Sequence, residues 1–225
     1  MANLQTFGID ISSYSLDIDW HKVANNIRPR FIFARAYHIG DTPATTMPDD
    51  RFGEYWSAAA ALNIPRGAYL FCDPTADAAD SVAKFYSVYS PKVGDLVPTL
   101  DIEDAYDNSS VVPLPKRIAQ IQTMIDRVSA KIGGQKPLIY TKKRVWDDLG
   151  SPPQFANCPL WVMNYNTMPV PGNLPASWST FAFWQCAENI KDNSLHQYGV
   201  TGDYDLNLFN GPESDLSKFC ITQVS

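Results

Sequence analysis

The chain has 225 residues, is 45% hydrophobic and carries a formal net charge of −6 at pH 7. A chain of this length buries roughly 70% of its unfolded surface in one core, so residues 1–225 are expected to form a single domain. The acidic balance, without any run of Lys and Arg, argues against a nucleic-acid partner. No stretch reaches the ~20 apolar residues that cross a bilayer, which argues against a membrane partner.

Short runs of β-branched and aromatic residues alternate with longer stretches of helical periodicity. This alternation is typical of βα units around a largely parallel sheet, and seven or eight strands of this kind indicate a barrel. In chain order, the expected strands cover residues 6–12, 30–37, 66–72, 96–103, 137–141, 159–165, 180–186 and 203–208. The expected helices cover residues 17–26, 50–62, 76–89 and 115–132.

The helix expected at residues 115–132 has the clearest periodicity. Its apolar residues fall on one stripe at helical spacing. A glycine pair follows and provides the stop. The stripe consists of Ile118, Ile121, Ile125, Val128 and Ile132, followed by Gly133 and Gly134.

Acidic residues follow the expected fourth strand, which is apolar until it reaches Asp101 and Glu103. Residues two apart in a strand face the same side, so these two carboxyl groups are expected to lie about 6–7 Å apart. Neighbouring carboxylates raise each other's pKa, which readily leaves one acid protonated beside one ionised group. Glycoside hydrolysis needs this pair of states. The alternative is that both residues merely end a strand and begin a polar loop.

Two further acids lie in the first and last expected strands, Asp10 and Asp205. The first and last strands of a closed barrel are neighbours, so these side chains are expected to share the mouth of the barrel with Asp101 and Glu103. Catalytic groups of parallel barrels gather at that end. The alternative for Asp10 is a hydrogen bond that closes the barrel.

Motifs along nearly the whole chain resemble the Chalaropsis-type lysozymes, family 25 of the glycoside hydrolases. Their shared order and spacing carry the resemblance. They are Gly8-Ile9-Asp10-Ile11-Ser12, Ile18-Asp19-Trp20, Phe31-Ile32-Phe33-Ala34-Arg35-Ala36, Gly67-Ala68-Tyr69-Leu70-Phe71, Leu100-Asp101-Ile102-Glu103, Pro137-Leu138-Ile139-Tyr140-Thr141, Leu160-Trp161-Val162-Met163-Asn164-Tyr165, Phe183-Trp184-Gln185 and Asp205-Leu206-Asn207-Leu208-Phe209.

The resemblance implies a modified, irregular TIM-like β/α barrel that acts as an N-acetylmuramidase on bacterial peptidoglycan, a bacteriolytic activity. It implies Glu103 as the general acid, Asp101 as its carboxylate partner orienting the substrate's acetamido group, and an acidic floor completed by Asp10 and Asp205. It also implies that a set of aromatic residues binds the sugars. These residues are Tyr69, Tyr140, Trp161, Tyr165 and Trp184.

Three positions depart from the family pattern. Leu70 stands where a His is frequent, Arg35 where a Lys is common, and Asn164 where Ala or Gly is more usual. None of them removes an acid, so they bear on affinity or glycan preference. A non-catalytic glycan-binding or phage structural module on the same fold is the alternative function, although such a module would need only the aromatic residues.

No cofactor is expected. His21, His38 and His196 lack ligand spacing, and a magnesium site on the four acids is the remaining metal alternative. The cysteines form no CxxC pair and stay free or form one disulfide. They are Cys72, Cys158, Cys186 and Cys220.

The first residues show neither a basic start nor an apolar stretch of signal-peptide length. We therefore expect a phage-encoded endolysin released from the host cytoplasm, or export by another route. The expected partner is the glycan strand of peptidoglycan, bound by a monomer.

Overall fold

A computed structural model describes residues 6–165, 170–187 and 204–225. In these ranges, eight strands form a closed barrel, which β1 and β2 complete by pairing with each other. The strands are β1 (Phe7–Ile11), β2 (Ile32–His38), β4 (Arg66–Phe71), β5 (Thr99–Asp101), β6 (Leu138–Lys142), β7 (Leu160–Met163), β8 (Phe183–Ala187) and β9 (Asp205–Phe209). The predicted α/β barrel is confirmed, with strand ends that differ by a few residues.

The barrel is mixed. Neighbouring strands from β1 through β8 run parallel, whereas β9 is antiparallel to both β8 and β1. A short strand β3 (Met47–Pro48) adds an antiparallel edge to β2 and was not predicted. Alternation of apolar and polar residues encodes which face is buried but not the direction of the strand, so the reversal of β9 could not be predicted from the sequence.

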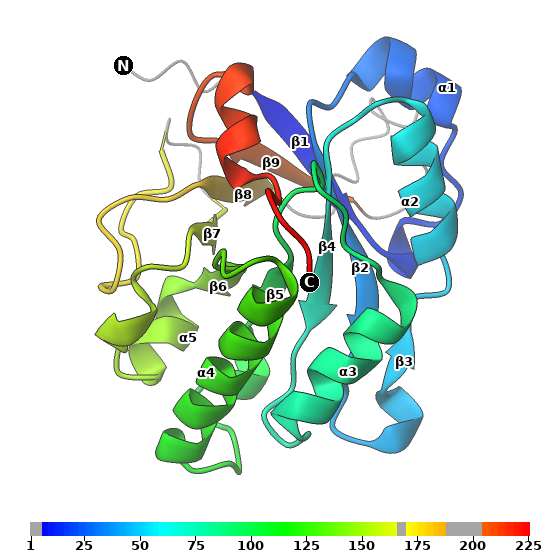
Figure 1. The fold of residues 1–225 in the computed structure, drawn as a ribbon. Coiled ribbons are helices and arrows are strands. Elements are labelled where there is room, and N and C mark those ends of the chain that lie inside the picture. The colour runs from blue at the N-terminus through cyan, green and yellow to red at the C-terminus, as the bar shows by residue number, and fades with distance from the viewer. Residues whose placement is uncertain (1–5, 166–169, 188–203) are drawn as a thin grey trace.

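Helices surround the barrel (Figure 1). They are α1 (Trp20–Lys22), which continues as a π-helical turn over Val23–Ile27, α2 (Phe52–Ala61), α3 (Ala78–Val88), α4 (Leu114–Lys131) and α5 (Lys143–Asp148). The first predicted helix starts three residues late because the Asp19 side chain caps it by accepting the Lys22 N–H. The six-residue α5 was not predicted, since so short a helix shows no clear periodicity.

The helix α4 confirms its predicted stripe. Ile121, Ile125 and Val128 are buried, and α3 packs against this helix. Gly133 adopts a φ of +63°, the left-handed conformation that ends a helix. No described helix is both long and apolar enough to cross a membrane.

Aromatic rings fill the end of the barrel where the parallel strands begin. Phe33 stacks on Trp161 at 4.3 Å between ring centroids and meets Phe183 edge-on at 5.1 Å. A Cβ atom on Gly67 would lie 2.6 Å from the Phe33 ring, so this strand position needs a glycine to admit the ring. This packed layer closes the interior below the polar residues at the other end.

All four cysteines are free thiols. Of the two predicted states, free thiols or one disulfide, the structure therefore shows the first.

Candidate active site

A pocket of about 180 Å³ opens at the carboxyl ends of the parallel strands. It contains the four acids that the sequence predicted together: Asp10 from β1, Asp101 from β5, Glu103 just beyond β5, and Asp205 from β9. Its lining consists of Asp10, Ser12, Tyr14, Arg35, Tyr69, Phe71, Asp101, Glu103, Tyr140, Trp161, Gln185 and Asp205. The predicted convergence of acids from separate strands is present.

Asp101 and Glu103 form a hydrogen-bonded carboxyl pair. Asp101 is the deeper group, with 5% of its surface exposed, while Glu103 is half-buried. Burial raises the pKa of both groups, and the negative charge of Glu103 raises the pKa of Asp101 further. The hydrogen bond raises the pKa of Asp101 and lowers that of Glu103, which favours one proton held between the two groups.

Asp10 lies opposite Asp205 in the pairing of β1 with β9. The Asp10 Oδ2 atom accepts hydrogen bonds from Asn207 Nδ2 at 2.7 Å and from Gln185 Nε2 at 3.1 Å. Gln185 Nε2 also donates to Asp205 Oδ2 at 2.8 Å, so one amide joins the two carboxylates. Burial raises the pKa of Asp10 to about 6, against the lowering effect of its two amide donors. Asp10 therefore both lines the pocket and holds β1, β8 and β9 together.

The pocket walls are aromatic. Tyr140 Oη donates to Gln185 Oε1 at 2.6 Å, and Tyr165 Oη reaches the same oxygen at 2.8 Å. Trp161 Nε1 donates to Asn207 Oδ1 at 2.7 Å, and its ring meets Tyr140 edge-on. These hydrogen bonds fix the amides that in turn hold the acids, so the walls and the floor form one polar network.

Comparison with known proteins decides the family. The sequence profile described as "Glycosyl hydrolases family 25" matches residues 9–195. The chain belongs to this family of glycoside hydrolases. The resemblance expected from the motifs is therefore confirmed.

Relatives of this family 25 domain match it over nearly its whole length. Over 222 residues it is 29% identical to "Uncharacterized protein YegX" of Escherichia coli O157:H7, covering 97% of this chain and 74% of that protein. Over 218 residues it is 28% identical to "Lysozyme M1" of Streptomyces globisporus, covering 93% and 69%. The structure of a muramidase from Acremonium alcalophilum matches with a TM-score of 0.77 at 27% identity, covering 96% of this chain and 98% of that one.

Four of the five aromatic residues predicted to bind sugars lie at the pocket or bond to it. Tyr69, Tyr140 and Trp161 line it, and Tyr165 bonds to its Gln185. Trp184 is not among the described lining residues. It lies between the inward-facing Phe183 and Gln185 on β8, is buried, and donates its indole N–H to the Asn164 carbonyl oxygen at 2.7 Å. Successive residues of a strand face opposite sides, so Trp184 and Gln185 cannot both face the pocket.

The family motifs contained two further residues of the site, Gln185 at the pocket and Asn207 behind it, to which sequence reasoning gave no role. Gln185 follows Trp184, and Asn207 lies two residues after Asp205 on the same face of β9. Alternation of side chains along a strand could have predicted that both amides lie on the inner face of the barrel. Tyr14 had no such signal, because it lies in a 3₁₀ turn (Ser13–Ser15) after β1.

Arg35 is the only cation among the described residues that line the pocket. Its Nε atom pairs with Asp49 Oδ2 at 2.9 Å, and a terminal nitrogen donates to Ser13 Oγ at 3.0 Å. The guanidinium also lies 5.0 Å from the centre of the Tyr14 ring. Arg35 thus fixes the turn that carries Tyr14, a residue with 68% of its surface exposed at the pocket rim.

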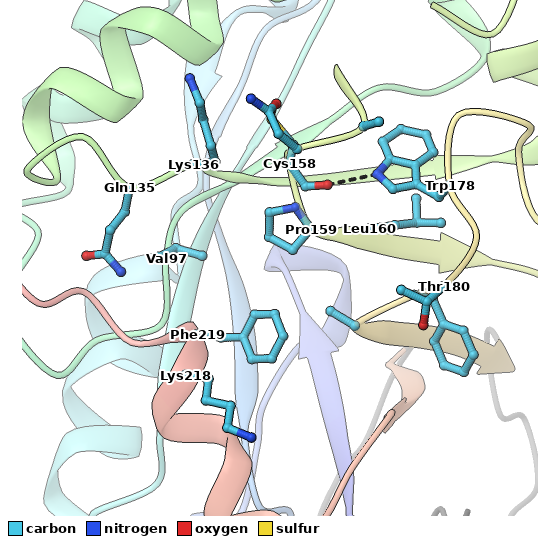
Figure 2. A pocket seen from close by; sticks show the side chains of 14 residues that line it. Val97, Gln135, Lys136, Cys158, Pro159, Leu160, Trp178, Thr180, Lys218 and Phe219 are labelled. Carbon is cyan, nitrogen blue, oxygen red and sulfur yellow. Dashed lines mark hydrogen bonds between the residues drawn. The ribbon is translucent and has the colours of Figure 1, made fainter. Parts of the chain in front are cut away.

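A larger cavity of about 440 Å³ lies at the opposite end of the barrel, where β7 and β8 begin (Figure 2). Its walls are largely apolar and include Pro159, Leu160 and Phe219, with Lys136 and Lys218 as its charged residues. The described lining contains no carboxyl group, so this cavity lacks the groups for acid catalysis. In the described ranges no group of three or more His, Cys, Asp or Glu side chains is arranged to hold a metal ion.

We expect Asp10→Asn to stabilise the fold above pH 6 while slowing hydrolysis. The pKa of Asp10 rises from 3.8 to about 6 on folding, so its contribution to stability is complete below 3.8 and is lost as the pH rises through 6. Asn cannot ionise, yet its oxygen can accept the same amide hydrogen bonds. The melting temperature should rise by several degrees at pH 8 and hardly at pH 4, because each kcal/mol shifts it by about 2–4 °C in a chain of this size. Calorimetry at both pH values checks this, and a loss at pH 8 contradicts it.

Proposed function

We propose that this family 25 domain hydrolyses the β-1,4 bond between N-acetylmuramic acid and N-acetylglucosamine in peptidoglycan, with Glu103 as general acid. The observation that carries the proposal is the hydrogen-bonded pair of Asp101 and Glu103, whose pKa values are both raised, in an open pocket. A carboxyl group with an ordinary pKa is ionised near neutrality, whereas raised pKa values favour a pair that has a proton to deliver.

The positions of the two carboxyl groups support different roles. Glu103 is the more accessible one and is suited to protonate the oxygen of the leaving sugar. In the reactive state the proton of the pair lies on Glu103, hydrogen-bonded to Asp101. Asp101 then becomes the ionised partner, suited to orient the acetamido group and to stabilise positive charge at the anomeric carbon.

The remaining acids add negative potential to the pocket floor. Asp10 and Asp205 stay in place through their shared donor Gln185. A fixed negative floor stabilises the positive charge of an oxocarbenium-like transition state without reorganising during the reaction.

Purified bacterial cell walls provide the test. Wild-type protein should clear a wall suspension and release fragments whose new reducing ends are muramic acid, identified by reduction and mass spectrometry. New reducing ends of glucosamine would support a glycoside hydrolase but show that it cleaves the other glycosidic bond of the glycan. Tight binding to walls without any new ends would replace the proposal with the alternative, a glycan-binding module.

We expect hydrolysis to be fastest below neutrality. The reaction needs the proton that Asp101 and Glu103 share, and raising the pH removes it even though burial holds their pKa values above the ordinary range. The rate of release of reducing ends, measured across the pH range, should fall on the alkaline side. A rate that stays flat from about pH 5 to about pH 9 contradicts the need for a shared proton.

A further inference from the structure

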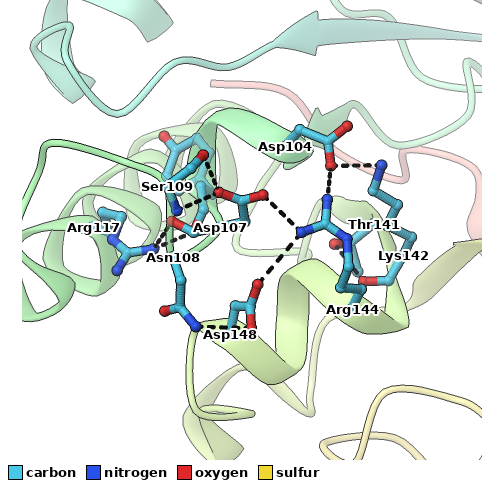
Figure 3. Close-up of polar contacts among 10 residues, drawn as sticks. Asp104, Asp107, Asn108, Ser109, Arg117, Thr141, Lys142, Arg144 and Asp148 are labelled. Carbon is cyan, nitrogen blue, oxygen red and sulfur yellow. Dashed lines mark hydrogen bonds and ion pairs between the residues drawn. The ribbon is translucent and has the colours of Figure 1, made fainter.

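An ion-pair network begins directly after Glu103. Asp104 Oδ1 binds Lys142 Nζ at 2.6 Å and also pairs with the Arg144 guanidinium (Figure 3). Arg144 has two more acidic partners, Asp107 Oδ2 at 2.7 Å and Asp148 Oδ2 at 3.5 Å. Asp104 therefore joins the cation at the end of β6 to the cation at the start of α5.

Strand register places Lys142 beside Glu103. Asp101 of β5 pairs with Tyr140 of β6, and the Ile102 N–H donates to the Tyr140 carbonyl oxygen at 2.9 Å. Glu103 keeps an extended backbone, with φ of −113° and ψ of −152°. Two residues further along each strand, Glu103 and Lys142 therefore fall on the same side as the pocket-lining pair Asp101 and Tyr140.

Titratable groups from three strands and one turn act on Glu103, in the pocket that Arg35 and Asp205 also line. Asp101 of β5 and Asp10 of β1 are acidic, Tyr140 and Lys142 come from β6, and Asp104 lies in the 3₁₀ turn Asp104–Tyr106. Lys142 is the cation among the described groups with the largest effects on the pKa of Glu103, which it lowers, whereas Asp104 raises that pKa. A general acid flanked by an unpaired ammonium group would lose its proton too readily.

We propose that Asp104 is a positioning residue that holds the Lys142 ammonium group in an ion pair on the outer side of the pocket and so prevents it from pairing with Glu103. The inference rests on the proposed function, since it gives Asp104 a role in keeping the general acid protonated. With 57% of its side chain exposed, Asp104 pairs with Lys142 at the surface, while only 21% of the Lys142 side chain is exposed.

Removing the Asp104 charge has unequal effects on its two partners. Arg144 retains Asp107 and Asp148. Among the described residues, Asp104 is the only ion-pair partner of Lys142 within 4.0 Å. Losing the Asp104 charge therefore frees the ammonium group to turn toward Glu103, which strand register places on the same side. The variant Asp104→Asn therefore perturbs Lys142 more than Arg144.

The test is a titration of the Glu103 carboxyl group by NMR, with glutamate labelled at the carboxyl carbon, and it does not need enzyme activity. The chain has only four glutamates, and Glu103→Gln identifies the signal. In Asp104→Asn the midpoint should fall by about one pH unit, the lower end of the effect of one opposite charge at close range. Adding Lys142→Gln to Asp104→Asn should bring the midpoint back to the wild-type value or above it, and the control Asp148→Asn should leave it unchanged.

Hydrolysis measured over the same pH range gives the second readout. The alkaline limb of kcat/KM should move to lower pH in Asp104→Asn, giving about tenfold slower hydrolysis above the optimum and little change well below it. A uniform loss at every pH, or a midpoint that stays at its wild-type value, overturns the inference and leaves Asp104 a structural role. If wild-type protein releases no reducing ends but the midpoint still moves, the proposed function fails and the ion-pair role stands.

Discussion

Replacing Glu103 with Gln is expected to slow the hydrolysis of cell walls by at least about 100-fold, because general acid catalysis contributes about 10²–10⁴ to such rates. Gln keeps the size of the side chain but has no proton to give to the leaving sugar. Folding should be preserved, since Glu103 is only half-buried and lies outside the regular strand. Turbidity loss and release of reducing ends measure the rate, and wall binding should remain close to wild type.

A matched substrate separates the loss of the acid from general damage to the site. Glu103→Gln should still hydrolyse a glycan fragment that ends in N-acetylmuramic acid with a dinitrophenyl leaving group, because that group departs without protonation. A rate above a tenth of wild type on cell walls would assign the proton donor to another residue. Loss of activity on both substrates would point to damaged binding instead.

Asp101→Asn is expected to lower the rate on cell walls by about 100-fold without lowering the melting temperature near neutral pH. The variant removes the negative charge that Asp101 carries when the proton of the pair lies on Glu103. Burial raises the pKa of Asp101 well above its ordinary range, so a neutral amide avoids the cost of ionising a buried group. Kinetics and calorimetry on one preparation check both parts.

The result for Asp101→Asn also shows whether Glu103 needs the Asp101 carboxylate for catalysis. In the wild type, Asp101 Oδ1 is buried without a hydrogen-bond partner among the described residues. Retained activity in this variant would mean that Glu103 acts alone. Lost activity together with a lowered melting temperature would mean that the carboxyl group is needed for folding rather than for charge.

The order of strands and the grouping of acids could be predicted because both follow from local patterns. Each apolar run marks a strand, and closure of the barrel places Asp10 opposite Asp205, as the structure shows. The closeness of Asp101 and Glu103 followed from their spacing along the chain. These inferences needed only side-chain alternation and the geometry of a closed sheet.

The remaining features depend on contacts that a sequence pattern does not specify. The reversed direction of β9 depends on which strands it lies between, and the ion pair of Asp104 with Lys142 joins residues that lie far apart in the chain. The prediction for Trp184 came from its place in a family motif, which suggested that its side chain faces the pocket. Strand alternation places that side chain on the opposite face of β8, where it donates to the Asn164 carbonyl oxygen. Strand alternation could have placed Gln185 at the pocket, but its hydrogen bonds join four partners from four other strands and loops and could not be predicted.

Direct titration of the wild-type carboxyl pair tests the central claim, with glutamate and aspartate labelled at their carboxyl carbons and signals identified by Glu103→Gln and Asp101→Asn. The Asp101 and Glu103 signals should respond to each other's ionisation, and both should retain a proton above the ordinary range of about 3.9–4.3. Independent titration of both groups within that ordinary range would contradict a protonated acid in this pocket.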